Sequence, residues 1–385
     1  MKNFEFHNPT RIVFGADTVG RIDQLIPAHA RVLILYGGAS AEKTGTLAEV
    51  RLALGQRSVQ EFGGIEPNPS YETLMRAVQL VRAEKLDFLL AVGGGSVIDG
   101  TKFVAAAALY DGEPWEIAEQ GGGNIKQALP IGTVLTLPAT GSEMNSGAVV
   151  TRKATHAKLP FRNVLLYPQF SVLDPSKTFT LPTKQVANGL VDAYVHTIEQ
   201  YLTYPVQAHV QDRFAEGLLQ TLIEIAPQAV AAPDDYSTRA NLMWTATLAL
   251  NGLIGAGVPQ DWATHMIGHE LTALYDIDHA RTLALVLPAL LDIQRDSKRA
   301  KLLQYAARVW NIHSGSEDER ITAAIASTRA FFEGLGIPTR LSAYGLGQEA
   351  IAAVLHQLEA HGMTALGEQR DIDLARSRRI LEAAL

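Results

Sequence analysis

The hydrophobic pattern of the sequence changes near residue 182, and this change constrains the fold more than any other feature. From residue 183 onward, apolar residues recur at spacings of three and four, which predicts helices nearly throughout. Up to residue 182, short apolar runs alternate with helical patterns. The runs include RIVF (11–14), VLILY (32–36), LDFLLAV (86–92), TVLTL (133–137) and SVLD (171–174). Nearly continuous apolar strands separated by helices predict a parallel sheet with helices on both faces.

The length of the chain fits two domains. Its 385 residues exceed the roughly 100–200 that one domain usually contains. We expect an α/β domain over residues 1–182 and an all-α domain over residues 183–385, with the boundary near Leu181 and Pro182. The clearest helical patterns of the second part are at 185–202, 212–230, 237–254 and 300–310.

The composition excludes several classes of function. The chain has no cysteine, which excludes disulfides, thiolate metal ligands and cysteine nucleophiles, and which suits a cytosolic protein. A net charge of −7 without a long basic run disfavours nucleic-acid binding. The N-terminal stretch lacks the apolar core of a signal peptide, and the most apolar run, Leu283–Leu291, is shorter than the roughly 20 residues that span a bilayer.

Two glycine-rich turns follow predicted strands. GGGSVIDGTK (93–102) opens a helical run, so its backbone amides and the helix N-terminus would attract a phosphate; the alternative is a tight turn that needs a positive φ. PATGSEMNSG (138–147) would either line a cofactor cleft or cap a helix at the surface. Ligands of parallel sheets bind at the carboxyl ends of the strands, where both turns lie. Together the two turns favour a nucleotide site.

The helical half contains a cluster of metal-ligating residue types. Asp192 and His196 are four residues apart and share one helix face, and His265 and His269 repeat this spacing on a second predicted helix. His279 follows on a short loop. A carboxylate with neutral imidazoles is a ligand set for a divalent transition metal, although any one of these histidines alone would more often be a hydrogen-bonded core or surface residue. The five groups together predict a metal site.

The order and spacing of these motifs resemble the iron-containing alcohol dehydrogenase family over almost the entire chain. The motifs are GGGSVID (93–99), TLPATGSE (136–143), Asp192 with His196, and His265 with His269 and His279. PATGSE and LNGLIGAGVPQDWATH are most similar to the bacterial NADPH-dependent aldehyde reductase and butanol dehydrogenase branch. The resemblance implies a dehydroquinate synthase-like fold. In that fold an N-terminal Rossmann-like dinucleotide-binding domain precedes a helical metal-binding domain, and the cleft between them holds cofactor and metal.

The resemblance also implies which residues form the site. The metal, Fe²⁺ or Zn²⁺, would be held by one carboxylate and three imidazoles: Asp192, His196, His265 and His279. His269 would lie beside the metal as a catalytic residue that is not a ligand. The contacts to NADP(H) would come from both turns and from nearby hydroxyl, amide and ammonium groups: Gly37, Gly38, Ser40, Asn68, Gly94, Gly95, Ser96, Val97, Asp99, Thr136, Thr140, Ser142, Asn145 and Lys158.

The end of the second predicted strand indicates which cofactor is used. Dinucleotide folds that prefer NAD place an acidic residue there to hold the ribose 2′-hydroxyl. Here VLILY continues into Gly37-Gly38-Ala39-Ser40, with Lys43 close behind, so no carboxylate stands at the strand end to repel a 2′-phosphate. Backbone amides, Ser40 and Lys43 are suited to bind that phosphate. We therefore predict NADPH rather than NADH.

These features predict a metal-dependent oxidoreductase that reduces small aldehydes to primary alcohols with NADPH. We expect a homodimer in which NPTRIVFG (8–15) supplies an edge strand that pairs across subunits. Two alternatives share the fold: an NAD-linked polyol dehydrogenase, which would need an acidic residue near Gly37, and a non-redox lyase, which would need a basic pocket. A metal- or nucleotide-binding protein with a decayed site is the alternative from another class.

Overall fold

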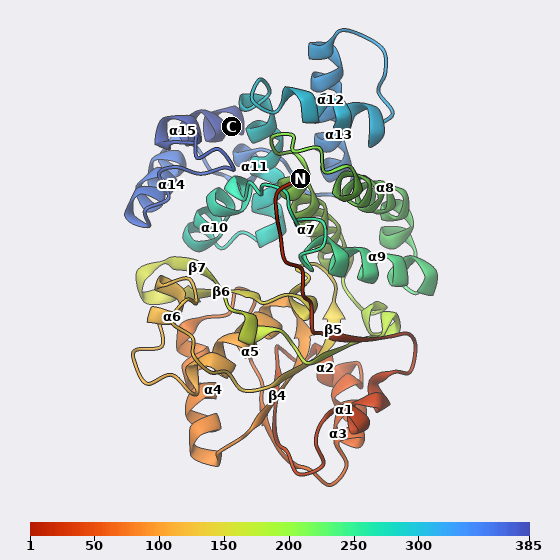
Figure 1. The fold of residues 1–385 in the computed structure, drawn as a ribbon, viewed down its shortest axis with the longest axis vertical. Coiled ribbons are helices and arrows are strands. Elements are labelled where there is room, and N and C mark those ends of the chain that lie inside the picture. Colours follow the sequence, from red (N-terminus) through yellow and green to blue (C-terminus); the bar gives the residue numbers. More distant parts are fainter. The chain divides into compact units, whose positions relative to one another are not determined.

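The computed structural model describes residues 1–385, which form two compact units (Figure 1). The α/β unit comprises His7–Pro182 and Ala232–Thr247. The helical unit comprises Met1–Phe6, Thr183–Ala231 and Leu248–Leu385. The change of hydrophobic pattern at residue 182 coincides with one of the divisions between them.

Two segments depart from the contiguous division expected from the sequence. Residues 1–6 belong to the helical unit, and residues 232–247 belong to the α/β unit. The second exchange has a packing reason, because Met243 lies in a core cluster of the α/β unit and the Thr247 hydroxyl donates to Glu143 Oε1 at 2.5 Å. The helical spacing of apolar residues does not reveal which unit a helix packs against. The assignment of residues 232–247 to the α/β unit therefore could not be predicted from the sequence.

The α/β unit is built on a sheet of six parallel strands in the order β1-β8-β5-β4-β2-β3. In that order the strands are Arg11–Phe14, Phe170–Leu173, Ile131–Leu137, Phe88–Gly94, Arg31–Tyr36 and Ser58–Phe62. All five apolar runs expected as strands lie in this sheet. The sixth strand, β3, was not expected because its sequence, SVQEF, is polar and partly exposed. Antiparallel strands β6 (Gly147–Arg152) and β7 (Ala157–Arg162) form a separate hairpin, which was also not expected.

Alternate residues of the sheet pack into two separate cores. Leu33 and Leu89 face one core with helices α4 and α5, whereas Ile34 and Leu90 face the other with helices α1 and α3. This is the period of two expected for strands that are covered on both faces. The helices of the unit are α1 (Ile22–Leu25), α2 (Ser40–Lys43), α3 (Thr46–Leu54), α4 (Tyr71–Glu84), α5 (Gly95–Ala107) and α6 (Glu116–Glu119).

The connections after β2 and β4 leave the sheet toward opposite faces. Helix α3, which follows β2, packs into one core, and α5, which follows β4, packs into the other. The two strands are neighbours, paired from Val32 with Phe88 to Tyr36 with Val92. Their carboxyl ends therefore form the switch point at which open α/β sheets bind ligands. A Cβ added to Gly37 would lie 3.6 Å from Val97 Cγ2, so the two connections lie side by side.

The helical unit surrounds a helix that is buried on all sides. Helix α7 is buried from Val186 to Tyr201, so its polar side chains must find partners inside the protein. The helices of this unit are α7 (Thr183–Tyr201), α8 (His209–Ala231), α10 (Ala263–Tyr275), α11 (His279–Ile293), α12 (Arg299–Arg308), α13 (Glu317–Gly334), α14 (Gln348–Ala360) and α15 (Leu374–Ala383). Helix α9 (Tyr236–Ala249) crosses the division between the units and ends five residues before the expected Ile254. None of the helices has the length and apolar character that a membrane span requires.

Candidate metal centre and nucleotide loops

Two of the candidate metal ligands lie one turn apart on α7. Asp192 is 3% exposed and His196 is 4% exposed, and Nε2 of His196 lies 3.7 Å from Oδ1 of Asp192. Burying an ionisable group is costly unless it is paired or coordinates a metal. The two side chains therefore need partners from other helices of the same unit.

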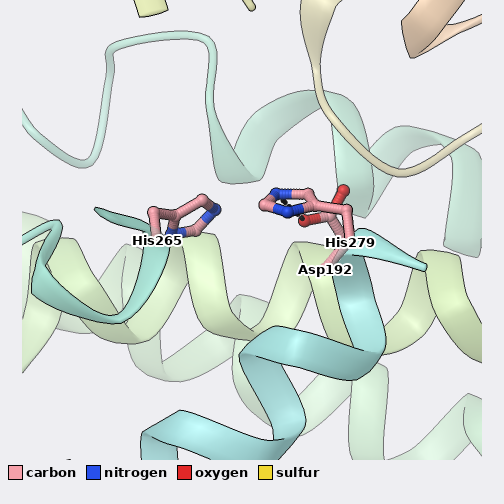
Figure 2. A group of neighbouring side chains, drawn as sticks. All are labelled: Asp192, His265 and His279. Carbon is pink, nitrogen blue, oxygen red and sulfur yellow. Dashed lines mark ion pairs between the residues drawn. The ribbon is translucent and has the colours of Figure 1, made fainter. Parts of the chain in front are cut away.

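Those partners come from α10 and α11. His265 lies in the first turn of α10, and His279 is the first residue of α11 rather than a loop residue as expected. The ligand atoms of Asp192, His265 and His279 all lie within 4.8 Å of one another. Figure 2 shows the three side chains converging, with a ring nitrogen of His265 directed toward His279 and Asp192.

This set of donor atoms fits a divalent transition metal. Nε2 of His279 lies 3.8 Å from Oδ1 of Asp192, and the His196 ring stacks on the His265 ring with centroids 4.7 Å apart. Ligands of a tetrahedral zinc ion lie roughly 3.4 Å from one another, so small side-chain shifts would complete the coordination. Oxygen and imidazole ligands suit both Fe²⁺ and Zn²⁺. The structure thus brings three of the four predicted ligands into one group, with His196 next to Asp192 and His265.

His269 lies beside this group. It follows His265 by one turn of α10, is 3% exposed, and has its ring centroid 5.1 Å from that of His279. The five groups gathered from the sequence therefore meet within one unit.

Glu199 is a further buried residue of this centre that the sequence analysis missed. Its side chain hydrogen-bonds Nδ1 of His265 and accepts the backbone amide of Thr264 at 2.7 Å. A signal was present in the sequence, because Glu199 follows His196 by three residues and Asp192 by seven, which places all three on one face of the helix.

In the α/β unit, the glycines of the turn between β4 and α5 are required by close packing. None of Gly93, Gly94 and Gly95 has a positive φ, so the alternative based on positive φ is wrong. A Cβ on Gly93 would lie 2.6 Å from Val97 Cγ2, and a Cβ on Gly95 would lie 2.3 Å from Thr140 Oγ1. The missing side chains allow this turn to touch the loop that follows β5.

The remaining candidate cofactor contacts lie near or after the carboxyl ends of strands β2, β3 and β5, or on the hairpin of β6 and β7. Gly37, Gly38 and Ser40 connect β2 to α2, and Thr136 lies near the end of β5. Around the turn after β4, the backbone N–H of Asn68 donates to Ser96 Oγ at 3.3 Å. Lys158, on hairpin strand β7, donates to Asn68 Oδ1 at 2.9 Å. The predicted contacts thus come from five parts of the sequence of the α/β unit.

Asp99, Ser142 and Asn145 belong to one hydrogen-bonded network with Lys102, a residue that the sequence analysis missed. Lys102 Nζ donates to Ser142 Oγ at 2.9 Å and to Asn145 Oδ1 at 3.1 Å, and Ser142 Oγ donates to Asp99 Oδ1 at 2.6 Å. Burial lowers the pKa of Lys102 to about 8 and raises the pKa of Asp99. These side chains hold the two glycine turns together from within. A lysine inside the apolar run of α5 was the available signal.

Comparison with known proteins decides the family. A family model described as iron-containing alcohol dehydrogenase matches residues 9–175, and a model of the C-terminal part of the Fe-containing alcohol dehydrogenase family matches residues 186–383. The chain belongs to the iron-containing alcohol dehydrogenase family. The resemblance inferred from the motifs is confirmed.

Individual members of the iron-containing alcohol dehydrogenase family match along the whole chain. NADPH-dependent aldehyde reductase YqhD of Escherichia coli (strain K12) is 64% identical over 386 residues, covering 100% of both chains. Probable NADH-dependent butanol dehydrogenase 1 of Bacillus subtilis (strain 168) is 40% identical, also covering 100% of both. The crystal structure of E. coli K-12 YqhD has a TM-score of 0.99 at 63% identity, covering 100% of this chain and 99% of that chain. That of NADH-dependent butanol dehydrogenase A from Thermotoga maritima has a TM-score of 0.94 at 37% identity with the same coverage, and the expected fold class is confirmed.

The buried Lys102 network generates a prediction about stability. Replacing Lys102 with Met should lower the free energy of unfolding by about 3–5 kcal/mol, because it removes a fully buried cation from the half-buried Asp99 carboxylate and from the oxygens to which it donates. Guanidinium unfolding followed by circular dichroism measures the loss. The exposed Lys126, changed to Met, is the matched control and should unfold like the wild type. Equal midpoints for the two variants would contradict the role assigned to the network.

Proposed function

We propose that this protein is a metal-dependent oxidoreductase that reduces small aldehydes to primary alcohols with NADPH, and that catalyses the reverse oxidation as well. The observation that carries the proposal is the convergence of Asp192, His265 and His279 in the helical unit of an iron-containing alcohol dehydrogenase. The E. coli relative that is 64% identical over the full length is named as an NADPH-dependent aldehyde reductase, which supports the substrate and the cofactor.

The metal would be held by Asp192, His196, His265 and His279. When bound, Fe²⁺ or Zn²⁺ supplies a Lewis acid that polarises a carbonyl oxygen. Three of the four side chains that would hold the metal lie at buried positions on α7 and α10, which would limit the directions from which a carbonyl group can approach. His279 is the more exposed ligand, with 22% of its side chain accessible, so the open side of the centre lies next to α11.

NADPH would bind to the α/β unit and supplies the hydride. Residues Gly94–Val97 lie at the N-terminus of α5, a helix of 13 residues. Their backbone amides and the Ser96 hydroxyl would bind the pyrophosphate. Near the nicotinamide we place Thr136, Thr140, Asn145 and Lys158, with Asn68 on the phosphate side. Asp99 and Ser142 would act by holding these loops, since their side chains bind each other at 2.6 Å.

The connection after β2 supports a preference for the 2′-phosphate. Gly38, Ser40 and Lys43 are all exposed there. The nearest acidic residue along the chain, Glu42, receives two hydrogen bonds from the Arg51 guanidinium, at 3.0 and 2.9 Å, and Arg51 also binds Glu61. No acidic residue occupies the end of β2, so the NAD-linked polyol dehydrogenase is not favoured. The two family models that match the chain both describe alcohol dehydrogenases, so the lyase alternative is not favoured either.

The partners of the proposed enzyme are small aldehydes and alcohols, and a second copy of the chain. Strand β1 pairs only with β8 and lies at the edge of the sheet, where its other side is available for pairing. We propose that the homodimer forms through this edge and that the enzyme works in the cytoplasm.

The test of the proposed function is the loss of NADPH absorbance with butanal, with NADH in parallel. We expect the metal-replete enzyme to prefer NADPH by about tenfold or more, because a charged hydrogen bond contributes ~1.5–3 kcal/mol. Metal-depleted enzyme should lose the activity and recover it when Fe²⁺ or Zn²⁺ is added. Replacing Ser40 with Ala should lower kcat/KM for NADPH but not for NADH. Absence of oxidation of either cofactor across a panel of short aldehydes would contradict the proposal.

His269 is the proposed proton relay for the alkoxide. It is buried next to His279 without belonging to the proposed ligand set, so replacing it with Asn should lower kcat by about 10²-fold or more while metal content stays at the wild-type value. Metal analysis and steady-state kinetics of the same preparation separate the two effects. The exposed His209, changed to Asn, is the control. Metal loss in the His269→Asn variant would make His269 a ligand instead.

A further inference from the structure

Within the helical unit, a carboxylate lies directly behind His265. Glu199 of α7 is 2% exposed, and its Oε2 hydrogen-bonds Nδ1 of His265. Its Oε1 accepts the backbone amide of Thr264 at 2.7 Å. One side chain therefore contacts both a proposed metal ligand and the first turn of the helix that carries it.

Helix α10 depends on this contact because it begins without a side-chain cap of its own. Trp262 occupies the N-cap position with a φ of 64° and makes no side-chain capping hydrogen bond. Two carboxylates from outside the helix replace the cap: Asp261 Oδ1 accepts the Ala263 amide at 3.0 Å, and Glu199 accepts the next amide. Acidic groups at a helix N-terminus are also favoured by the helix dipole.

Asp261, the first of these carboxylates, is anchored by a buried lysine. Lys298 Nζ lies 2.7 Å from Asp261 Oδ2 and 2.9 Å from Glu368 Oε2, and it donates to the Leu202 carbonyl at 2.7 Å. Each of the three charged side chains is at most 3% exposed. The start of α10 is therefore held in one position relative to α7, and so is the His265 ring.

The hydrogen bond from His265 also decides which ring nitrogen faces the proposed metal. An ionised carboxylate only accepts, so with Glu199 ionised, as it would be beside a bound cation, Nδ1 of His265 carries the proton and Nε2 presents its lone pair. A carboxylate behind a ligating imidazole fixes the ring orientation and raises its basicity, and losing such a partner typically weakens metal binding by about 10- to 100-fold. In Figure 2 a ring nitrogen of His265 is directed toward His279 and Asp192.

We propose that Glu199 is a positioning residue for the metal. It holds His265 in the tautomer and orientation that ligation through Nε2 requires, and it does so from the helix that already carries Asp192 and His196. This inference rests on the proposed metal site.

The Glu199→Gln variant tests the proposal because it changes hydrogen-bonding chemistry with little change of shape. Its carbonyl oxygen can still accept the Thr264 amide, while its amide group presents a donor to Nδ1 of His265 and favours the wrong tautomer. The control is Glu216→Gln on α8. Glu216 is 5% exposed and accepts from Tyr201 at 2.9 Å and from Arg213 at 2.8 Å, away from the ligands.

Zn²⁺ affinity of the metal-depleted full-length protein is measured by competition with a chromophoric chelator, together with the thermal midpoint of each metal-free variant. We expect E199Q to bind Zn²⁺ about 10- to 100-fold more weakly than wild type, and E216Q to bind it as wild type does. Wild-type affinity in E199Q would overturn the proposal. A wild type that binds no Zn²⁺ would instead overturn the metal site itself.

The Glu199→Asp variant covers the case in which E199Q does not fold. It keeps two acceptor oxygens but is one methylene shorter, so it cannot reach Thr264 and His265 together at the present distances. We expect an intermediate loss of Zn²⁺ affinity. Wild-type affinity in E199D would show that the contact does not position the ligand.

Discussion

The helical unit depends on the burial of charge-bearing side chains on α7. This helix is enclosed from Val186 to Tyr201, yet one face carries Asp192, His196 and Glu199. Such groups are retained in a protein interior only where partners offset the lost hydration. Residues of α10 and α11 are those partners: His265 binds Glu199, and His279 lies 3.8 Å from Asp192. The proposed divalent ion adds the positive charge that suits this arrangement.

The α/β unit applies the same constraint to its nucleotide loops. Lys102 is fully buried and is balanced by Asp99 and by hydroxyl, amide and carbonyl oxygens of the loop after β5. The glycines of the turn after β4 let that loop approach closely, since a Cβ on Gly95 would overlap Thr140. The conformation of the loops at the switch point is therefore set by buried contacts, namely the Lys102 network and the packing of Gly95 against Thr140. Substitutions beneath the loops should change cofactor binding without touching the cofactor.

The sequence predicted the elements that are buried, because burial requires apolar residues at regular spacings. Strands such as β2 and β4 are apolar because both faces are covered, and α7 shows its period clearly. Strand β3 escaped prediction because SVQEF is half exposed, and the placement of residues 232–247 depends on tertiary packing. Four of the five ligand candidates were visible as two pairs spaced by four residues, His279 followed nearby, and the resemblance selected among the five. Glu199 and Lys102 left signals of the same kind, as charged residues on buried helix faces, and could have been found.

The most direct test of the central claim is anomalous X-ray diffraction from crystals of the metal-replete protein, recorded above and below the iron and zinc absorption edges. We expect one strong peak in the helical unit, with Asp192, His196, His265 and His279 at about 2.0–2.2 Å from the ion. A peak bound by other residues, or no peak in protein that reduces aldehydes, would contradict it.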